Sequence, residues 1–279
     1  MPVTMRVALC QINSQDDKEA NITRAEQLID EAAELGARLV ALPEYVDYLG
    51  PKDRKYEISE PIPGPVSERF AGKARQHGIY LLGGSYNQTS DIPGKCYNTS
   101  LLFNPSGEII ANYRKIHLFD SQISGNESDC ILPGNEVVTV EIDGHTFGIA
   151  IAYDYRFPEH FRMMALAGAE AILVPSNNTV TTGKDYWHVM LRARAVENHL
   201  FILAPAQIGP HEPDTIAYGH SLAVHPTGTC LVDAPDKECV VTADIDFNDV
   251  REARVRIPSL ANRRPDVYHG LHADRDHII

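Results

Sequence analysis

The stretch ANITRAEQLIDEAAELGARLVALPE, residues 20–44, joins a helical pattern directly to a buried strand. Over residues 20–35, apolar side chains recur at the 3.6-residue spacing that places them on one face of a helix. Gly36 follows as a typical C-terminal stop. The next run, residues 37–44, is mostly apolar and ends in Pro43 and Glu44, which is typical of a strand buried in a layered α/β domain.

The same alternation continues along the chain and predicts the α/β fold class. Further helical patterns cover residues 66–77, 159–167 and 184–198. Predicted strands cover residues 5–12, 80–86, 96–103, 109–113, 137–142, 146–152, 171–175, 201–206, 221–224, 230–232 and 240–245. Because the two halves match in outline, we expect them to face each other as a four-layer αββα sandwich.

The domain organisation follows from what separates these elements. No Gly/Pro/Ser-rich linker interrupts them, so residues 1–279 are predicted to form one domain. The polar stretch 121–135 is long enough to be a functional loop rather than a simple connection. From about residue 258 the chain becomes polar and irregular, and we expect this tail either to fray or to dock on a partner subunit.

Composition excludes several classes of function. A formal net charge of -13 argues against nucleic acid or anionic lipid as a partner. No apolar run approaches the roughly 20 residues of a membrane span, and the amino terminus lacks a signal-sequence pattern, so we expect a cytoplasmic protein. The five cysteines include no CxxC pair, the twelve histidines no HExxH spacing, and no glycine-rich phosphate loop is present. We therefore expect neither a metal nor another cofactor.

Chemically useful side chains stand where predicted strands end. Glu44 closes one strand, Lys115 follows the strand 109–113, and the strand 146–152 ends at Ala152. Reactive groups in open α/β sheets gather at such ends. A lone Glu or Lys after a strand is usually solvated, but a Glu and a Lys brought together in a dry site shift each other's pKa and can move protons.

Three segments carry a family resemblance. The segments LPEY (42–45), YRKIHLFD (113–120) and GIAIAYDYRFPE (148–159), in this order, resemble the three signatures of the nitrilase superfamily of carbon-nitrogen hydrolases. Residues 181–207, 218–228 and 262–268 are similar to downstream segments of its amidase branches, including the branch of omega-amidases and deaminated-glutathione amidase. The resemblance therefore spans nearly the whole chain.

The resemblance implies a Glu-Lys-Cys catalytic set. Glu44 would be the general base, and Lys115 would stabilise the oxyanion together with the backbone N–H of Tyr153. A second family glutamate matches Glu127 in GNESD, although this loop is shorter than in many relatives and a lone acid in a loop is mostly solvent-facing. The nucleophile's position is occupied by Ala152, whose methyl group cannot attack a carbonyl.

Two explanations of Ala152 compete. One is an engineered Cys-to-Ala substitution, made to trap an intact substrate, that keeps the base, the oxyanion donors and the shape of the site, and the other is a natural pseudoenzyme that binds a ligand or a partner without turnover. We favour the substitution, because a chain released from catalysis would be expected to lose Glu44 or Lys115 as well. Cys130, the cysteine nearest to Glu127 in the sequence, does not close a matching strand.

The resemblance favours a small carboxylic acid with a terminal amide as substrate, such as the 2-oxo acid monoamide 2-oxoglutaramate. N-carbamoyl amino acids and nitriles remain alternatives, because the same thiol attack serves all three. Candidate substrate-binding residues are Arg156, Asn177, Asn178, Thr179, Thr182, Tyr48 and Trp187. Arg156 offers a planar fork for a carboxylate, or it only ties Asp154 or Glu159 in place.

The other candidates also have ordinary structural explanations. The Asn and Thr residues would suit a simple turn, and the two aromatic residues would suit the core. Relatives usually dimerise through the helices around Glu159 and Lys184, and we expect a homodimer or a higher homo-oligomer here.

Overall fold

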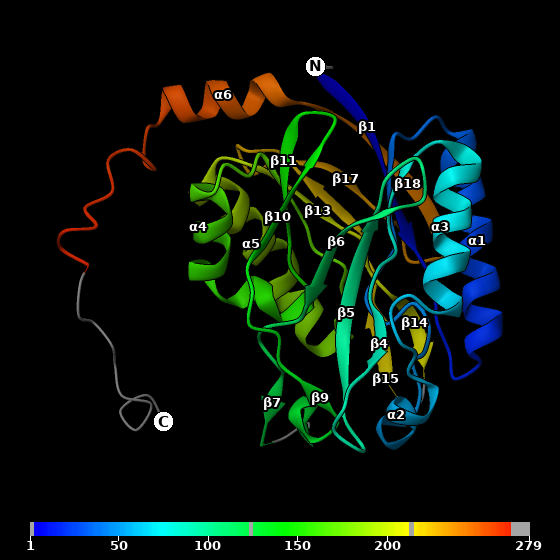
Figure 1. Cartoon of the computed structure of the whole chain (residues 1–279). Coiled ribbons are helices and arrows are strands. Elements are labelled where there is room, and N and C mark those ends of the chain that lie inside the picture. Colours follow the sequence, from blue (N-terminus) through cyan, green and yellow to red (C-terminus); the bar gives the residue numbers. More distant parts are fainter. Residues whose placement is uncertain (1–2, 123–124, 212–214, 269–279) are drawn as a thin grey trace.

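The structure is a computed structural model that describes residues 3–122, 125–211 and 215–268. Two β-sheets pack face to face, and helices cover the outer face of each sheet (Figure 1). The α/β fold class and the αββα order of layers are therefore confirmed.

The first sheet has eight strands, and most of them come from the first half of the chain. Its main path runs β18-β1-β2-β3-β5-β4, and β6 and β9 also pair with β5. The bounds are β1 Thr4–Gln11, β2 Leu39–Ala41, β3 Tyr80–Leu82, β4 Tyr86–Thr89, β5 Cys96–Phe103, β6 Ile109–Arg114, β9 Ile131–Leu132 and β18 Cys239–Asp246. Because β1, β2 and β3 are parallel, their carboxyl ends meet at one edge.

The second sheet has six strands in the order β10-β11-β12-β13-β16-β17. The bounds are β10 Val138–Ile142, β11 His145–Ile149, β12 Ala171–Leu173, β13 Phe201–Ala204, β16 Leu222–Val224 and β17 Cys230–Asp233. Strands β11, β12 and β13 are parallel and repeat the arrangement of β1, β2 and β3. Each sheet therefore has a set of parallel strands whose carboxyl ends meet at one of its edges.

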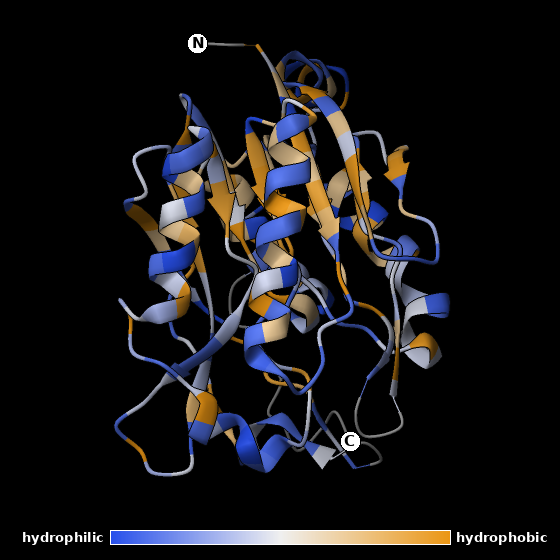
Figure 2. Ribbon diagram, turned by 90° about the vertical axis from the view of Figure 1, so that its right-hand side faces the viewer, coloured by the Kyte–Doolittle hydropathy of each residue, from blue (hydrophilic) through white to orange (hydrophobic). Residues whose placement is uncertain are grey.

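Three apolar layers hold the sandwich together. Helices α1 (Lys18–Glu34) and α3 (Pro65–His77) pack on the first sheet, and α4 (Pro158–Leu166) and α5 (Val180–Asn198) pack on the second. The third layer lies between the sheets, where Leu9 and Phe147 are buried in one cluster. Figure 2 shows hydrophobic strands behind helices whose outward turns are hydrophilic, as expected of amphipathic helices over a buried sheet.

Several predicted boundaries differ from the observed ones. The predicted strand 80–86 divides into β3 and β4 around Gly84, whose φ of 65° breaks the extended backbone. The predicted strand 146–152 ends at Ile149, and Ala152 instead begins a 3₁₀ turn, η3 (Ala152–Arg156). Helix α5 begins at Val180, four residues before the predicted start.

Other elements were not predicted. Helix α6 (Phe247–Arg256) buries only Phe247 and Val250, so the sequence shows no apolar stripe there. Strands β14 (Ile208–His211) and β15 (Thr215–Tyr218) pair with each other in a two-stranded sheet, and Ala217 of β15 also forms an isolated bridge with Thr179. Short elements also occur: η1 (Lys52–Arg54), α2 (Lys55–Ile58), β7 (Asp120–Ser121), β8 (Gly125–Asn126) and η2 (Glu127–Asp129).

After α6, residues 258–268 contain turns but neither helix nor strand, as the sequence predicts for this part of the tail. The tail beyond residue 268 lies outside the described residues. Among the helices within the described ranges, none is long and apolar enough to cross a membrane.

Candidate active site

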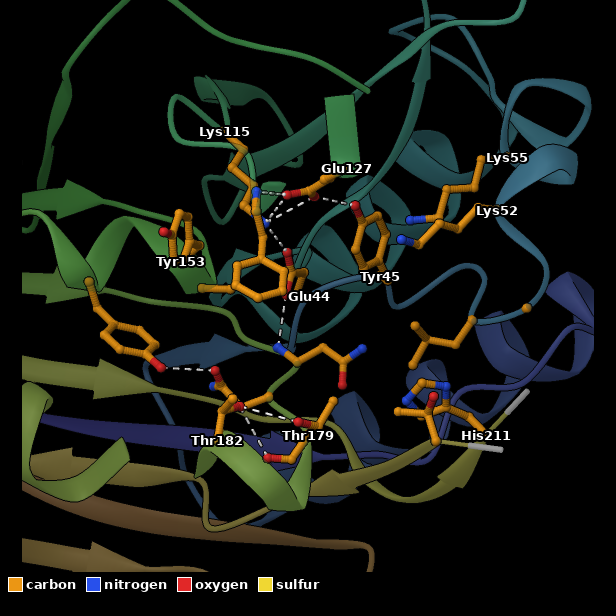
Figure 3. Close-up of a pocket in the computed structure, with 18 of the residues that line it drawn as sticks. Glu44, Tyr45, Lys52, Lys55, Lys115, Glu127, Tyr153, Thr179, Thr182 and His211 are labelled. Carbon is orange, nitrogen blue, oxygen red and sulfur yellow. Dashed lines mark hydrogen bonds and ion pairs between the residues drawn. The ribbon is translucent and has the colours of Figure 1, made fainter. Parts of the chain in front are cut away.

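The side chains that close the strands gather around one cavity. Glu44 follows β2, Lys115 follows β6, Glu127 begins η2 and Ala152 begins η3. All four line a cavity of about 320 Å³ (Figure 3). The remaining lining residues are Tyr45, Leu49, Gly50, Lys52, Lys55, Phe119, Tyr153, Tyr155, Arg156, Asn177, Asn178, Thr179, Thr182, His211 and Thr215.

Lys115 lies between two carboxylates. Its Nζ donates to Glu44 Oε1 at 3.0 Å and to Glu127 Oε1 at 3.0 Å, and it lies 2.9 Å from Glu127 Oε2. Glu44 is 2% exposed and Lys115 is 3% exposed, so this ion pair is almost completely shielded from water. Electrostatic interactions of such a buried group are stronger than at the surface.

Each carboxylate is also fixed by neutral donors. Glu44 Oε1 accepts a hydrogen bond from Asn98 Nδ2 at 2.9 Å, and Glu44 Oε2 accepts one from the backbone N–H of Asn177 at 2.9 Å. Glu127 accepts from the hydroxyl of Tyr45 at 2.7 Å and from the backbone N–H of Phe119 at 2.8 Å. The three charged side chains are therefore held in position before any ligand binds.

Electrostatic interactions shift the pKa values of Glu44 and Glu127 in opposite directions. Burial raises the pKa of Glu44, and Lys115 offsets this only in part, while the charge of Glu127 raises it further. Burial also acts to raise the pKa of Glu127, but Lys115 and Lys55 outweigh it and lower that pKa to about 2. Burial acts to lower the pKa of Lys115, but the two carboxylates outweigh it and raise that pKa. Glu44 is thus the group of the three whose proton affinity is raised toward neutral pH.

The turn at Ala152 has an unusual backbone. Ala152 has a φ of 41°, in the left-handed region that non-glycine residues rarely adopt, and its N–H donates to Pro175 O at 2.9 Å. Asp154 holds the turn, because its buried carboxylate accepts hydrogen bonds from the backbone N–H of Ile151 at 2.8 Å and from the Tyr113 hydroxyl at 2.6 Å. A side chain at position 152 is thereby directed into the cavity.

Most predicted substrate-binding residues also line this cavity, namely Arg156, Asn177, Asn178, Thr179 and Thr182. The guanidinium of Arg156 lies 4.2 Å from the ring centroid of Tyr186, so aromatic stacking helps to orient it. Tyr155 donates through its hydroxyl to Asn178 Oδ1 at 3.0 Å. Within the part of the chain that the structure describes, the buried atoms Asn177 Oδ1 and Asn178 Nδ2 have no hydrogen-bond partner.

Two predicted residues do not line the cavity. Trp187 is fully buried under the second sheet, and its Nε1–H donates to His220 O at 2.8 Å. Tyr48 is fully buried, and its hydroxyl donates to Pro51 O at 3.2 Å. The structure therefore favours their alternative interpretation as packing residues. Conversely, Tyr45, Lys52 and Lys55 line the cavity but were not predicted, although Tyr45 directly follows Glu44 in the LPEY segment.

Two groups of side chains in the described ranges have the composition of metal ligands, and neither belongs to the cavity lining. They are His117, Asp154 and His160, and His188, His220 and Asp233. In the first group the Asp154 carboxylate already accepts from the backbone of η3, as described above, and His117 Nδ1 lies 2.7 Å from its Oδ1. Asp154 therefore has a structural explanation without a metal.

Comparisons with known proteins agree with this geometry. Residues 6–255 match the carbon-nitrogen hydrolase family. The chain is 38% identical over 274 residues to human deaminated glutathione amidase, covering 95% of this chain and 84% of the relative. It is 36% identical over 271 residues to human omega-amidase NIT2, covering 95% and 97%.

A similar solved structure is that of a cysteine-to-alanine mutant of an amidase from Nesterenkonia AN1, of the nitrilase superfamily. It is 26% identical and superposes with a TM-score of 0.79, covering 94% of this chain and 95% of that one. The segment that matches the family includes the whole cavity and all strands of both sheets, with the exception of the amino-terminal two residues of β1. The chain thus belongs to the carbon-nitrogen hydrolase family, in the nitrilase superfamily.

Proposed function

We propose that this chain carries the active site of an amidase that releases ammonia by thiol acyl transfer, with Ala152 in place of the nucleophilic cysteine. The single observation that carries the proposal is the buried Lys115, which bridges Glu44 and Glu127 beside position 152. Burial of three charges is costly unless each is paired. The retention of these three charged side chains beside Ala152 supports the proposal that the site is built for catalysis.

With a thiol restored at position 152, the chemistry would proceed in two stages. Glu44 accepts the thiol proton, the sulfur forms a bond to the amide carbon, and the electron pair of the C=O bond moves to oxygen. Lys115 Nζ and the Tyr153 N–H stabilise this oxyanion. Collapse of the intermediate breaks the C–N bond, Glu44 returns its proton to nitrogen, and ammonia leaves an acyl thioester.

The second stage hydrolyses the thioester. Glu44 takes a proton from water, and the resulting hydroxide attacks the acyl carbon. Collapse of the intermediate breaks the C–S bond, Glu44 returns its proton to the sulfur, and the thiol and the carboxylic acid are released. The raised pKa of Glu44 suits both proton transfers, because a base is most effective when its pKa lies near the working pH. Glu127, whose pKa is lowered, stays ionised and holds Lys115 in position.

The chain as given would bind an amide without cleaving it. Ala152 retains the strained turn and the cavity but offers no electron pair. We interpret Ala152 as a Cys-to-Ala substitution of an active enzyme, and the retained Glu44–Lys115–Glu127 array supports this. A natural ligand-binding pseudoenzyme is the alternative.

The proposed substrate is a small carboxylic acid with a terminal amide, such as 2-oxoglutaramate. Its carboxylate would pair with Arg156, and its other polar groups would face Asn177 and Asn178, which line the cavity. The similarity to an omega-amidase and to a deaminated glutathione amidase supports this class. N-carbamoyl amino acids and nitriles are the alternatives within the superfamily.

The proposal includes a cytoplasmic homodimer or a higher homo-oligomer. Apolar side chains on the outer helices support association, because Met163 and Leu166 on α4 and Val189 and Val196 on α5 are each exposed. In this assembly the tail after about residue 258 would dock on a partner subunit.

A product assay tests the proposed chemistry. The Ala152→Cys variant is incubated with glutaramate, with 2-oxoglutaramate, with an N-carbamoyl amino acid and with a nitrile. Ammonia without carbon dioxide from the monoamides supports the amidase, and ammonia with carbon dioxide from the carbamoyl compound supports the first alternative. Selective turnover of the nitrile supports the second alternative. No turnover from a correctly folded variant overturns the amidase in favour of the pseudoenzyme.

A further inference from the structure

Lys55 is a buried cation that the proposed chemistry does not use. It begins α2, it is only 6% exposed, and it lines the cavity. Its Nζ lies 3.4 Å from the ring centroid of Tyr45. Within residues 3–122, 125–211 and 215–268, no carboxylate lies within ion-pair distance of this ammonium, in contrast to Lys115.

Among the residues that the structure describes, this ammonium therefore has no ion-paired carboxylate. The face of an aromatic ring attracts a cation, but it cannot satisfy three N–H donors. Burial lowers the pKa of Lys55, and the negative charge of Glu127 offsets this only in part. A buried charge is usually paired, because desolvation is costly. An anion that enters the cavity would supply the missing partner.

A second lysine lies on the same side of the cavity. Lys52 is exposed and also lines it, and Figure 3 shows the ammonium groups of Lys52 and Lys55 on one side of the Lys115–Glu127 pair, with Tyr153 on the other side. Arg156 belongs to the same turn as Tyr153. Besides Lys115, the cations that line the cavity therefore come from three elements, Lys52 from η1, Lys55 from α2 and Arg156 from η3.

We propose that Lys55, assisted by Lys52, forms an anion subsite distinct from Arg156, so that the cavity prefers an amide whose acyl part carries two carboxylates. One carboxylate would pair with Arg156 and the other with Lys55. A cavity of about 320 Å³ has the volume of a small-ligand site. The anion subsite is inferred from the surroundings of Lys55 and does not depend on the proposed function. That the ligand is an amide rests on the proposed function.

Binding to the chain as given tests the subsite without turnover. Calorimetry compares butanamide, glutaramate and the 1-monoamide of propane-1,2,3-tricarboxylic acid, which carry zero, one and two carboxylates. We expect the last to bind about tenfold or more tighter than glutaramate, since a charge-assisted hydrogen bond contributes at least that much. Lys55→Gln should abolish this gain, Lys55→Arg should keep part of it, and the exposed Lys237→Gln should keep all of it.

Other outcomes overturn the subsite. Equal binding of the one- and two-carboxylate amides contradicts it, and so does an equal loss for all three compounds in Lys55→Gln, which would indicate a packing role. If Lys55→Gln does not fold, Lys52→Gln serves instead, because it changes an exposed side chain. This variant must reduce the affinity gained from the second carboxylate, and an unchanged gain contradicts the proposal.

The Ala152→Cys variant separates this failure from that of the amidase. If this variant hydrolyses glutaramate but the two-carboxylate amide gains no affinity from Lys55, the subsite is refuted and the amidase stands. Binding of the dianion that depends on Lys55, without turnover of any amide, refutes the amidase and leaves the subsite standing.

Discussion

Lys115 Nζ donates to Glu44 Oε1 at 3.0 Å, and both side chains are almost fully buried. The two residues are 71 positions apart in the sequence, and each follows a strand of the same sheet. Their contact places a general base next to a fixed positive charge, beside the turn that carries position 152. Substitution of either residue, or of the groups that support them, should therefore change activity or stability in a defined direction.

Glu44→Gln in the Ala152→Cys background should lower kcat by about 10²- to 10⁴-fold, because the base that accepts the thiol proton is lost. The amide oxygen of the substituted side chain can still accept from Lys115, so the fold should persist. Steady-state ammonia release measures the effect, and circular dichroism checks folding. A matched control is Glu57→Gln, which changes an exposed glutamate on α2. Retention of full activity in Glu44→Gln would contradict the role of the base.

Lys115→Met should destabilise the protein by about 3–5 kcal/mol, because it leaves Glu44 and Glu127 buried without their shared cation. Urea denaturation of the chain as given measures the free energy of unfolding. Lys73→Met is a useful comparison, since Lys73 pairs with the half-exposed Asp30 on the surface and should cost about 1 kcal/mol or less. Similar losses in the two variants would show that the buried carboxylates do not depend on Lys115.

The pH dependence of the Ala152→Cys variant should report Glu44. The base acts only when ionised, so kcat/KM falls as the pH drops through the pKa of Glu44. Burial raises that pKa, so the decrease of kcat/KM at low pH, the acid limb of the profile, should lie above the usual glutamate pKa of about 4.3. Glu127→Gln removes a negative charge that raises it further, so the limb should move to lower pH. A limb that stays in place, or moves to higher pH, would contradict this coupling.

Asp154→Asn should disturb the turn that begins at position 152. The new amide group would face N–H donors from Ile151 and His117, and an unsatisfied buried donor costs about 1–3 kcal/mol. Urea denaturation should show this loss, and the Ala152→Cys background should lose activity because the thiol is misplaced. Asp53→Asn, at an exposed position in η1, should leave stability within about 0.5 kcal/mol. Unchanged stability in Asp154→Asn would show that the carboxylate does not hold the turn.

The layers of the fold and the core of the site were predictable from the sequence. Strand and helix patterns alternate clearly in both halves, and Glu44, Lys115 and Ala152 each stand near a strand end, where the structure brings them together. Glu127 lies in the same cavity, although its loop has no periodic pattern. Its prediction came from the resemblance rather than from spacing.

The features that the sequence did not predict correctly depend on contacts between segments, which no local pattern shows. Lys55 lies in a four-residue helix, which is too short to show a periodicity, and its burial depends on packing against Tyr45. Trp187 was a candidate for either the cavity or the core, and it lies in the core, because it and Leu191 are four residues apart on the helix face that packs on the second sheet. Strand β14 contains Gly209 and Pro210, both unfavourable in strands, and it depends on contacts outside itself, because it pairs with β15 and the Ile208 N–H donates to Ile12 O at 2.9 Å.

Trapping of the acyl thioester would test thiol acyl transfer at position 152 on the protein itself. The Ala152→Cys and Ala152→Ser variants and the chain as given are each mixed with glutaramate, quenched in acid within the first turnover, and measured by intact-protein mass spectrometry. We expect an added acyl mass on Ala152→Cys alone, mapped to position 152, with one equivalent of ammonia released. Ammonia release without a covalent adduct, or an adduct on another residue such as Cys130, would contradict thiol acyl transfer at position 152.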